Sequence, residues 1–64
     1  MLEYKILIQG DNINLSKVVK REVNNLGINA ICEALEVRYM GIRIRDYYRG
    51  LSRVREITYT FRTK

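Results

Sequence analysis

The sequence predicts one small α+β domain, in which a single helix packs on one face of a mixed or antiparallel sheet in the order β-α-β-β-β. Three observations predict this class. The chain has 64 residues, enough for one domain spanning 1–64. Nearly half of its residues are apolar, it has no Pro and only four Gly, and this composition is typical of a folded chain. Alternation of apolar and polar residues recurs along the chain, and apolar residues at helical spacing occupy 15–26.

The first half of the chain contains the clearest patterns. The period-2 pattern over 2–9 predicts a strand with one buried face, and the glycine and polar residues that follow it predict a turn. Apolar residues at helical spacing then predict a helix over 15–26. Asn14 is placed to cap its start, and Gly27 lies where helices commonly end.

The second half predicts three strands. The segment 30–39 contains good helix formers but ends in strand-like alternation, so a strand is favoured and a helix stays an alternative. Met40-Gly41 can form a two-residue turn into a third strand near 42–48. After a break at Gly50, alternation over 56–62 predicts the last strand.

One stretch of the chain also resembles a known family. The predicted first strand ends in Ile8-Gln9-Gly10-Asp11, and the predicted helix is followed by Leu26-Gly27-Ile28-Asn29 and then a hairpin. In these features residues 4–45 resemble the first half of ferredoxin-like domains, most nearly the small-ligand regulatory ACT domain. The resemblance implies a strand, a helix and a hairpin in that order. It makes a small-ligand sensor, with a pocket near residues 10–14, a third functional hypothesis, and no activity is carried over from it.

Charge is unevenly distributed along the sequence. Residues 1–37 have four basic and five acidic groups, a balance of −1, whereas residues 38–64 have eight basic and two acidic groups, a balance of +6. Seven of those eight basic groups are arginines. Because a guanidinium group donates in a planar fork that fits phosphate or carboxylate, this bias predicts an anionic partner.

Strand alternation predicts where these arginines lie. If the isoleucines at 42 and 44 face the core, the neighbouring polar side chains form the opposite face of the sheet. The candidate binding residues are Arg38, Arg43, Arg45, Tyr47, Arg49, Arg53, Arg55 and Arg62. Arginines that neutralise phosphates, beside a ring that can stack on bases, suit nucleic acid. An ordinary solvated sheet face would also be polar, but it does not explain seven arginines against two acids.

The leading hypothesis is therefore a small, non-enzymatic regulator that binds nucleic acid or a nucleoprotein. A second hypothesis, equally compatible with the size and charge, is an inhibitor of the kind encoded by phages and mobile elements, which would bind an acidic surface of a host protein. Either could act as a homodimer, because the segment 57–61 is a strong β-former that would be hazardous as an unpaired edge.

Several chemistries lack the residues that they need. The chain has no His, so the commonest general base and metal ligand is missing, and Cys32 is its only cysteine. We therefore expect no catalysis, no metal, no cofactor and no intramolecular disulfide, with Cys32 as a buried, inert thiol. No apolar run is long enough to span a bilayer and no secretory signal is evident, so the expected location is the cytoplasm.

Overall fold

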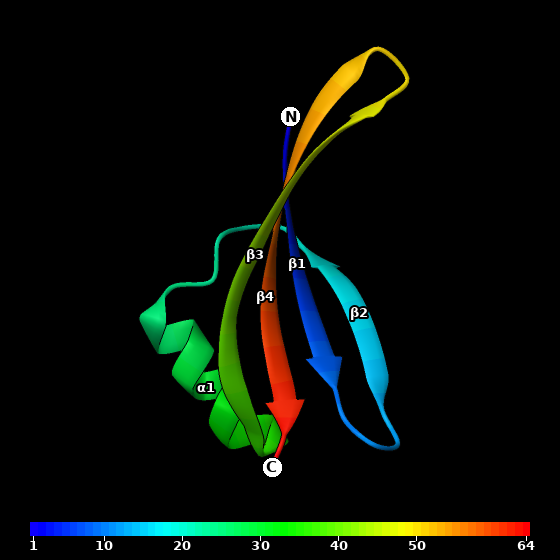
Figure 1. Ribbon diagram of the computed structural model, residues 1–64. Coiled ribbons are helices and arrows are strands. Elements are labelled where there is room, and N and C mark those ends of the chain that lie inside the picture. Colours follow the sequence, from blue (N-terminus) through cyan, green and yellow to red (C-terminus); the bar gives the residue numbers. More distant parts are fainter.

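The computed structural model describes all residues from 1 to 64, and five elements follow one another in the order β-β-α-β-β. They are β1 (Leu2–Gln9), β2 (Asn14–Val19), α1 (Asn25–Leu35), β3 (Val37–Arg49) and β4 (Ser52–Thr63). The strands form one mixed sheet in the order β2-β1-β4-β3, and α1 packs on one of its faces (Figure 1). The predicted class, α+β with one helix on one face of a mixed sheet, is confirmed, whereas the predicted order β-α-β-β-β is wrong.

The first hairpin accounts for the main error in element order. The predicted strand at 2–9 is confirmed as β1, but the predicted helix at 15–26 is wrong, because residues 14–19 form β2 and pair antiparallel with β1. The Gly10 N–H donates to the Ile13 carbonyl at 2.8 Å and closes the turn between them. Val18 and Val19 are β-branched and fit a strand better than a helix.

The helix begins ten residues later than predicted. Asn24, not Asn14, is its N-cap, and its side chain accepts a hydrogen bond of 2.8 Å from the Gly27 N–H. Gly27 therefore lies in the first turn and not at the C-terminal end. The helix ends at Glu36, which adopts a left-handed conformation (φ 53°) and donates its N–H to the Cys32 carbonyl. For residues 30–35 the favoured strand is therefore wrong and the helical alternative is correct. From Val37 onwards the predicted strand is present, as the start of β3.

The two long strands β3 and β4 form a single antiparallel hairpin. Its turn is at Gly50 and Leu51, where Gly50 has a φ of +64°, a value that glycine adopts without strain. The turn predicted at Met40-Gly41 is wrong: the pairing with β4 shifts by one residue there and forms a β-bulge within β3. The strands predicted at 42–48 and 56–62 lie inside β3 and β4.

The last strand is not an edge of the sheet. β4 lies between β1, to which it is parallel, and β3, so the expectation that residues 57–61 form an unpaired edge is wrong. The edge strands are β2 and β3. The segment containing α1 connects these two edges and crosses behind the sheet (Figure 1).

The core is small and lies between α1 and the sheet. Ile8, Val37, Tyr59 and Phe61 form its buried cluster, against which Ile28, Ile31 and Cys32 of α1 and Val23 of the preceding loop pack. Only six of the 64 residues are buried. The radius of gyration is 12.6 Å, against about 10.7 Å for a compact domain of this length. The far half of the β3–β4 hairpin extends beyond the helix (Figure 1), so the molecule is elongated.

Candidate nucleic-acid interface

The strand register divides the side chains of the sheet between two faces. The face away from α1 is called the open face below. From β1 and β4 it presents Glu3, Lys5, Leu7, Gln9, Glu56, Thr58, Thr60 and Arg62, and from β3 it presents Arg38, Arg43, Arg45, Tyr47 and Arg49. Six of the eight predicted binding residues therefore lie on one surface.

The β-bulge in β3 is what brings two of these arginines to the same face. Arg38 and Arg43 are five residues apart, so in a regular strand they would point to opposite faces. Met40 is an extra residue between the pairs Tyr39–Phe61 and Gly41–Thr60, so the alternation of β3 shifts by one residue at the bulge. Both arginines therefore face away from α1. Gly41 has a φ of +128°, and a Cβ there would meet nothing within 4 Å, so its backbone conformation and not a lack of space favours glycine.

Most of the net charge lies on the open face. It contains six cationic side chains, the five arginines and Lys5, against the carboxylates of Glu3 and Glu56. Its balance is therefore +4, out of +5 for the whole chain. The remaining charged residues, on the other face, in the loops and at the termini, nearly cancel. The charge is thus concentrated in space as well as in sequence.

In the half of the open face nearest the hairpin turn, two carboxylates offset most of the cationic charge. One oxygen of Glu56 lies 3.0 Å from the Lys5 ammonium and 3.4 Å from the Arg45 guanidinium, and the Tyr47 hydroxyl donates to it at 3.3 Å. Burial alone would raise the pKa of Glu56, but the hydrogen bond and charge of Lys5, aided by Arg45, lower it below its usual value. Glu56 is therefore a buried anchor that stays ionised.

Tyr47 is enclosed by this network. The Arg45 guanidinium carbon lies 4.6 Å from the centre of the Tyr47 ring, and the Arg49 carbon lies 5.8 Å from it. Arg49 also donates to the Tyr47 hydroxyl at 2.9 Å and to Glu3 at 3.2 Å, and the Glu3 contact raises the pKa of Arg49. Because cations already contact the ring and its hydroxyl is engaged, Tyr47 does not present the free surface that base stacking needs.

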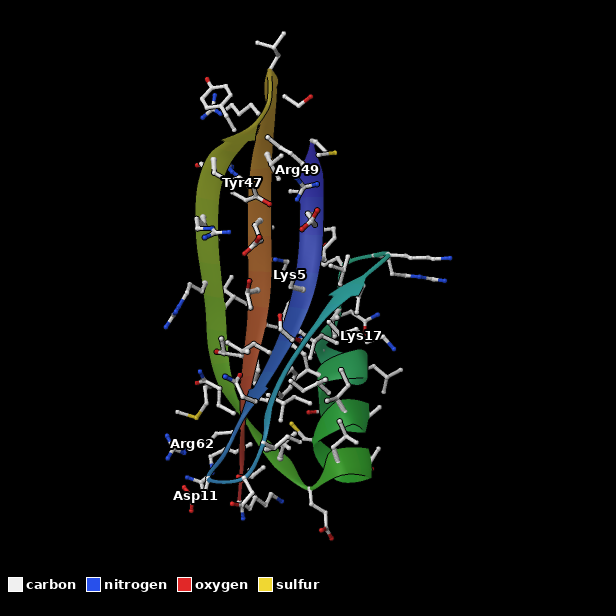
Figure 2. All side chains as sticks on the ribbon, turned by 90° about the vertical axis from the view of Figure 1, so that its right-hand side faces the viewer. Lys5, Asp11, Lys17, Tyr47, Arg49 and Arg62 are labelled. Atoms are coloured by element: carbon white, nitrogen blue, oxygen red, sulfur yellow. The ribbon has the colours of Figure 1, made fainter.

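The other half of the open face has three arginines without a partner. No carboxylate lies within ion-pair distance of Arg38, Arg43 or Arg62, which we call the arginine trio. Arg38 and Arg62 are direct cross-strand neighbours. Figure 2 shows Arg62 pointing away from α1, with Asp11 at the same end of the molecule, but no ion pair joins the two.

A shallow groove runs between two of these arginines. It has a volume of about 330 Å³ and is lined by Arg43, Arg62, Thr60 and Gln9 beside the bulge at Gly41. The Thr60 hydroxyl donates to the Gly41 carbonyl at 2.8 Å, which holds the bulge against β4. A second groove of about 220 Å³ continues from Arg43 towards Lys5. The two grooves share Arg43, so the cationic surface is continuous across the sheet.

The two remaining predicted residues lie elsewhere. Arg53 and Arg55 face the α1 side of the sheet, beyond the end of the helix. Arg55 binds Asp46 through two hydrogen bonds of 3.0 and 3.3 Å, which lower the pKa of Asp46 and raise that of Arg55. Arg53 is exposed and has no carboxylate partner. These two arginines therefore do not join the surface formed by the other six residues.

Some residues of this surface were not singled out from the sequence. Lys5 and Gln9 alternate with core residues of β1, so the period-2 pattern could have placed them on the open face. The Glu3–Arg49 and Glu56–Lys5 contacts could not have been found from the sequence, because they depend on the parallel pairing of β1 with β4, which are some fifty residues apart. The Glu56–Arg45 contact joins direct cross-strand neighbours of the β3–β4 hairpin. Of the two adjacent tyrosines, Tyr48 is the exposed one, on the α1 side of the sheet.

Comparison with known proteins adds no assignment. The chain matches no protein-family model, no curated protein and no solved structure.

No cluster of three or more side chains is arranged to hold a metal ion. None of the helical structure is long and apolar enough to cross a membrane.

Proposed function

We propose that this protein binds nucleic acid through the phosphate backbone, without catalysis, and that the arginine trio is the principal contact. The observation on which the proposal depends is the cross-strand pair Arg38–Arg62, which has no carboxylate partner and lies on the same face as the unpaired Arg43. Like charges directly opposite each other on a sheet destabilise it, by roughly 0.2–1 kcal/mol for an exposed pair. An anion bound between them would convert that repulsion into charge-assisted hydrogen bonds.

Phosphate suits this arrangement for two reasons. One guanidinium group can donate two parallel hydrogen bonds to two oxygens of the same phosphate, whereas the lysine ammonium acts as a point charge. Arg43 and Arg62 are separated by four residue steps along the strands, about 14 Å at 3.4 Å per residue, and both line the same groove. A groove of that length accommodates successive charges of a polyanion better than one isolated anion.

The state of Tyr47 supports contact with the backbone and not with the bases. It is the only aromatic residue on the open face, and Arg45 and Arg49 already contact its ring. Binding should therefore depend on phosphate charge and salt, with little preference among sequences.

The test is the salt dependence of binding to a fluorescently labelled 20-nucleotide oligonucleotide, in duplex and single-stranded form, followed by anisotropy. Three phosphate contacts give a slope near −2.7 in a plot of log K against log salt for a duplex, which is about a 40-fold loss between 50 and 200 mM. Arg43→Ala should reduce the magnitude of this slope by about 0.9. Arg53→Ala is the matched control, because it removes the same charge from the opposite face and should leave the slope unchanged.

Two results would overturn the proposal. The first is an equal loss of binding in the Arg43 and Arg53 variants, which would mean that only net charge matters. The second is no binding to either oligonucleotide at 50 mM salt. In that case the acidic surface of a protein partner would become the better explanation of the unpaired arginines.

A further inference from the structure

The edge strand β3 has no neighbour on one side. It is 13 residues long, and its only partner in the sheet is β4. Four of its side chains between 39 and 44 are large, apolar and exposed: Tyr39, Met40, Ile42 and Ile44. The two isoleucines, 54% and 56% exposed, lie on the α1 side in register with Tyr59 and Ile57. Tyr59 is buried, so the apolar surface of the sheet continues past the core and is left uncovered at β3.

The surface area of the molecule indicates how much cover is missing. A compact monomer of 7.6 kDa exposes about 4,300 Å², whereas this chain exposes 5173 Å². The excess is roughly 900 Å², close to the roughly 800 Å² that each partner buries in a standard protein interface. One interface of ordinary size would therefore bring the chain to the exposure of a compact protein.

The opposite edge of the sheet lacks these features. β2 has six residues, and Lys17 lies in the middle of its α1-side row, between Leu15 and Val19. Figure 2 shows Lys17 on the α1 side of the sheet. A charge in that row and a short strand are common ways in which proteins prevent edges from pairing. The α1-side row of β3 has no such charge in its middle, where Ile42 and Ile44 lie.

We propose that a second copy of this chain covers the exposed strip of β3, pairing antiparallel with it about a two-fold axis near Ile42–Ile44. The isoleucines of both copies would meet on the α1 side, and the free N–H and C=O groups of β3 would be hydrogen bonded. The result is one eight-stranded sheet with both open faces on the same side. If the proposed function is correct, the two arginine trios then form one cationic surface across the axis.

The test is sedimentation velocity of the whole chain between about 5 and 500 µM, without nucleic acid, so that its outcome does not depend on the proposed function. The expected result is a shift from monomer to dimer within this range. Ile42→Thr/Ile44→Thr keeps β-branched residues but removes apolar surface, and should weaken dimerisation at least tenfold. Val18→Thr is the matched control: Val18 is 57% exposed on the other edge strand and on the open face, and its change should leave the dimer intact.

A monomer at every concentration, or equal weakening by the Val18 variant, would overturn the proposal. Because the double variant could fail to fold, hydrogen exchange of the unmodified chain provides a second measurement. The alternate β3 amides that do not bond to β4 should exchange more slowly at 500 µM than at 5 µM, whereas the outer amides of β2 should not change. Equal exchange of the β3 amides at both concentrations would also overturn the dimer.

Discussion

Replacing Glu56 by glutamine tests the charge network that organises half of the open face. Glutamine has the same shape and retains one oxygen acceptor, but it removes the charge that lies 3.0 Å from Lys5 and 3.4 Å from Arg45. Both cations would then face each other across the sheet without a counter-ion. We expect Glu56→Gln to reduce stability and, because it frees two cations, to strengthen binding to nucleic acid.

The size of the stability loss follows from the exposure of each pair. The side chains of Lys5 and Glu56 are 26% and 9% exposed, so their hydrogen bond lies towards the lower end of the ~1.5–3 kcal/mol typical of bonds to charged groups. Arg45 is 64% exposed, and its pair is worth under ~0.5 kcal/mol after solvent screening. The sum is about 2 kcal/mol, a large part of the ~3–10 kcal/mol that 64 residues typically provide. At about 4–8 °C per kcal/mol for a small domain, Tm should fall by roughly 8–16 °C.

The assay is thermal unfolding by circular dichroism as a function of pH. The folded-state pKa of Glu56 is lowered, so its contribution is fully present above the unfolded value of about 4.3 and is lost as the pH falls through the folded value. The gap in Tm between the wild type and Glu56→Gln should therefore be constant from pH 6 to 8 and narrow progressively below pH ~4. Glu22→Gln removes the same charge from an exposed loop residue that has no ion pair, and should shift Tm by less than about 2 °C. A gap at pH 7 no larger than that of this control, or a gap that does not narrow at all as the pH falls below about 4, would refute the reasoning.

Three further substitutions test other parts of the fold. Phe61→Ala removes the largest fully buried side chain and should lower the free energy of unfolding by about 3–5 kcal/mol. Circular dichroism at 25 °C should then show much of the chain unfolded. A cooperative melt with a Tm within about 5 °C of the wild type would contradict the assigned core. Gly10→Ala would drive a methyl group into the Thr63 side chain and the Ile13 methyl, so we expect the free energy of unfolding to fall by about 1–2 kcal/mol, measured as a lower midpoint of urea denaturation. An unchanged midpoint would mean that the first turn adjusts without cost. Leu51→Ser changes a fully exposed residue at the hairpin turn and should alter stability by no more than ~0.5 kcal/mol, so a larger loss would show that the turn packs against something in solution.

The position of the helix shows what local sequence could not decide. Residues 15–26 and residues 25–35 both have apolar side chains at helical spacing, and each has an asparagine placed to cap its start. The difference between them is long-range: β1 has an edge whose hydrogen-bonding groups need a partner, and residues 14–19 are close enough to supply it through a four-residue turn. That pairing commits the first segment to a strand and leaves the second as the helix.

The sequence by itself determined the class of fold, the first strand and the segregation of charge, because these depend on composition and on the two-residue period of a strand. The open-face position of Arg38, Arg43 and Arg62 also followed from alternation, although a bulge and not a turn preserves it. Only the tertiary structure decided which arginines are unpaired. Glu3 pairs with Arg49 across strands that are distant in sequence, and Glu56 joins Lys5 of the distant β1 to Arg45 of the neighbouring β3. This leaves the arginine trio as the unpaired cations of the open face. The physical reason is that an ion pair depends on distances of a few ångströms in space, which local periodicity does not specify.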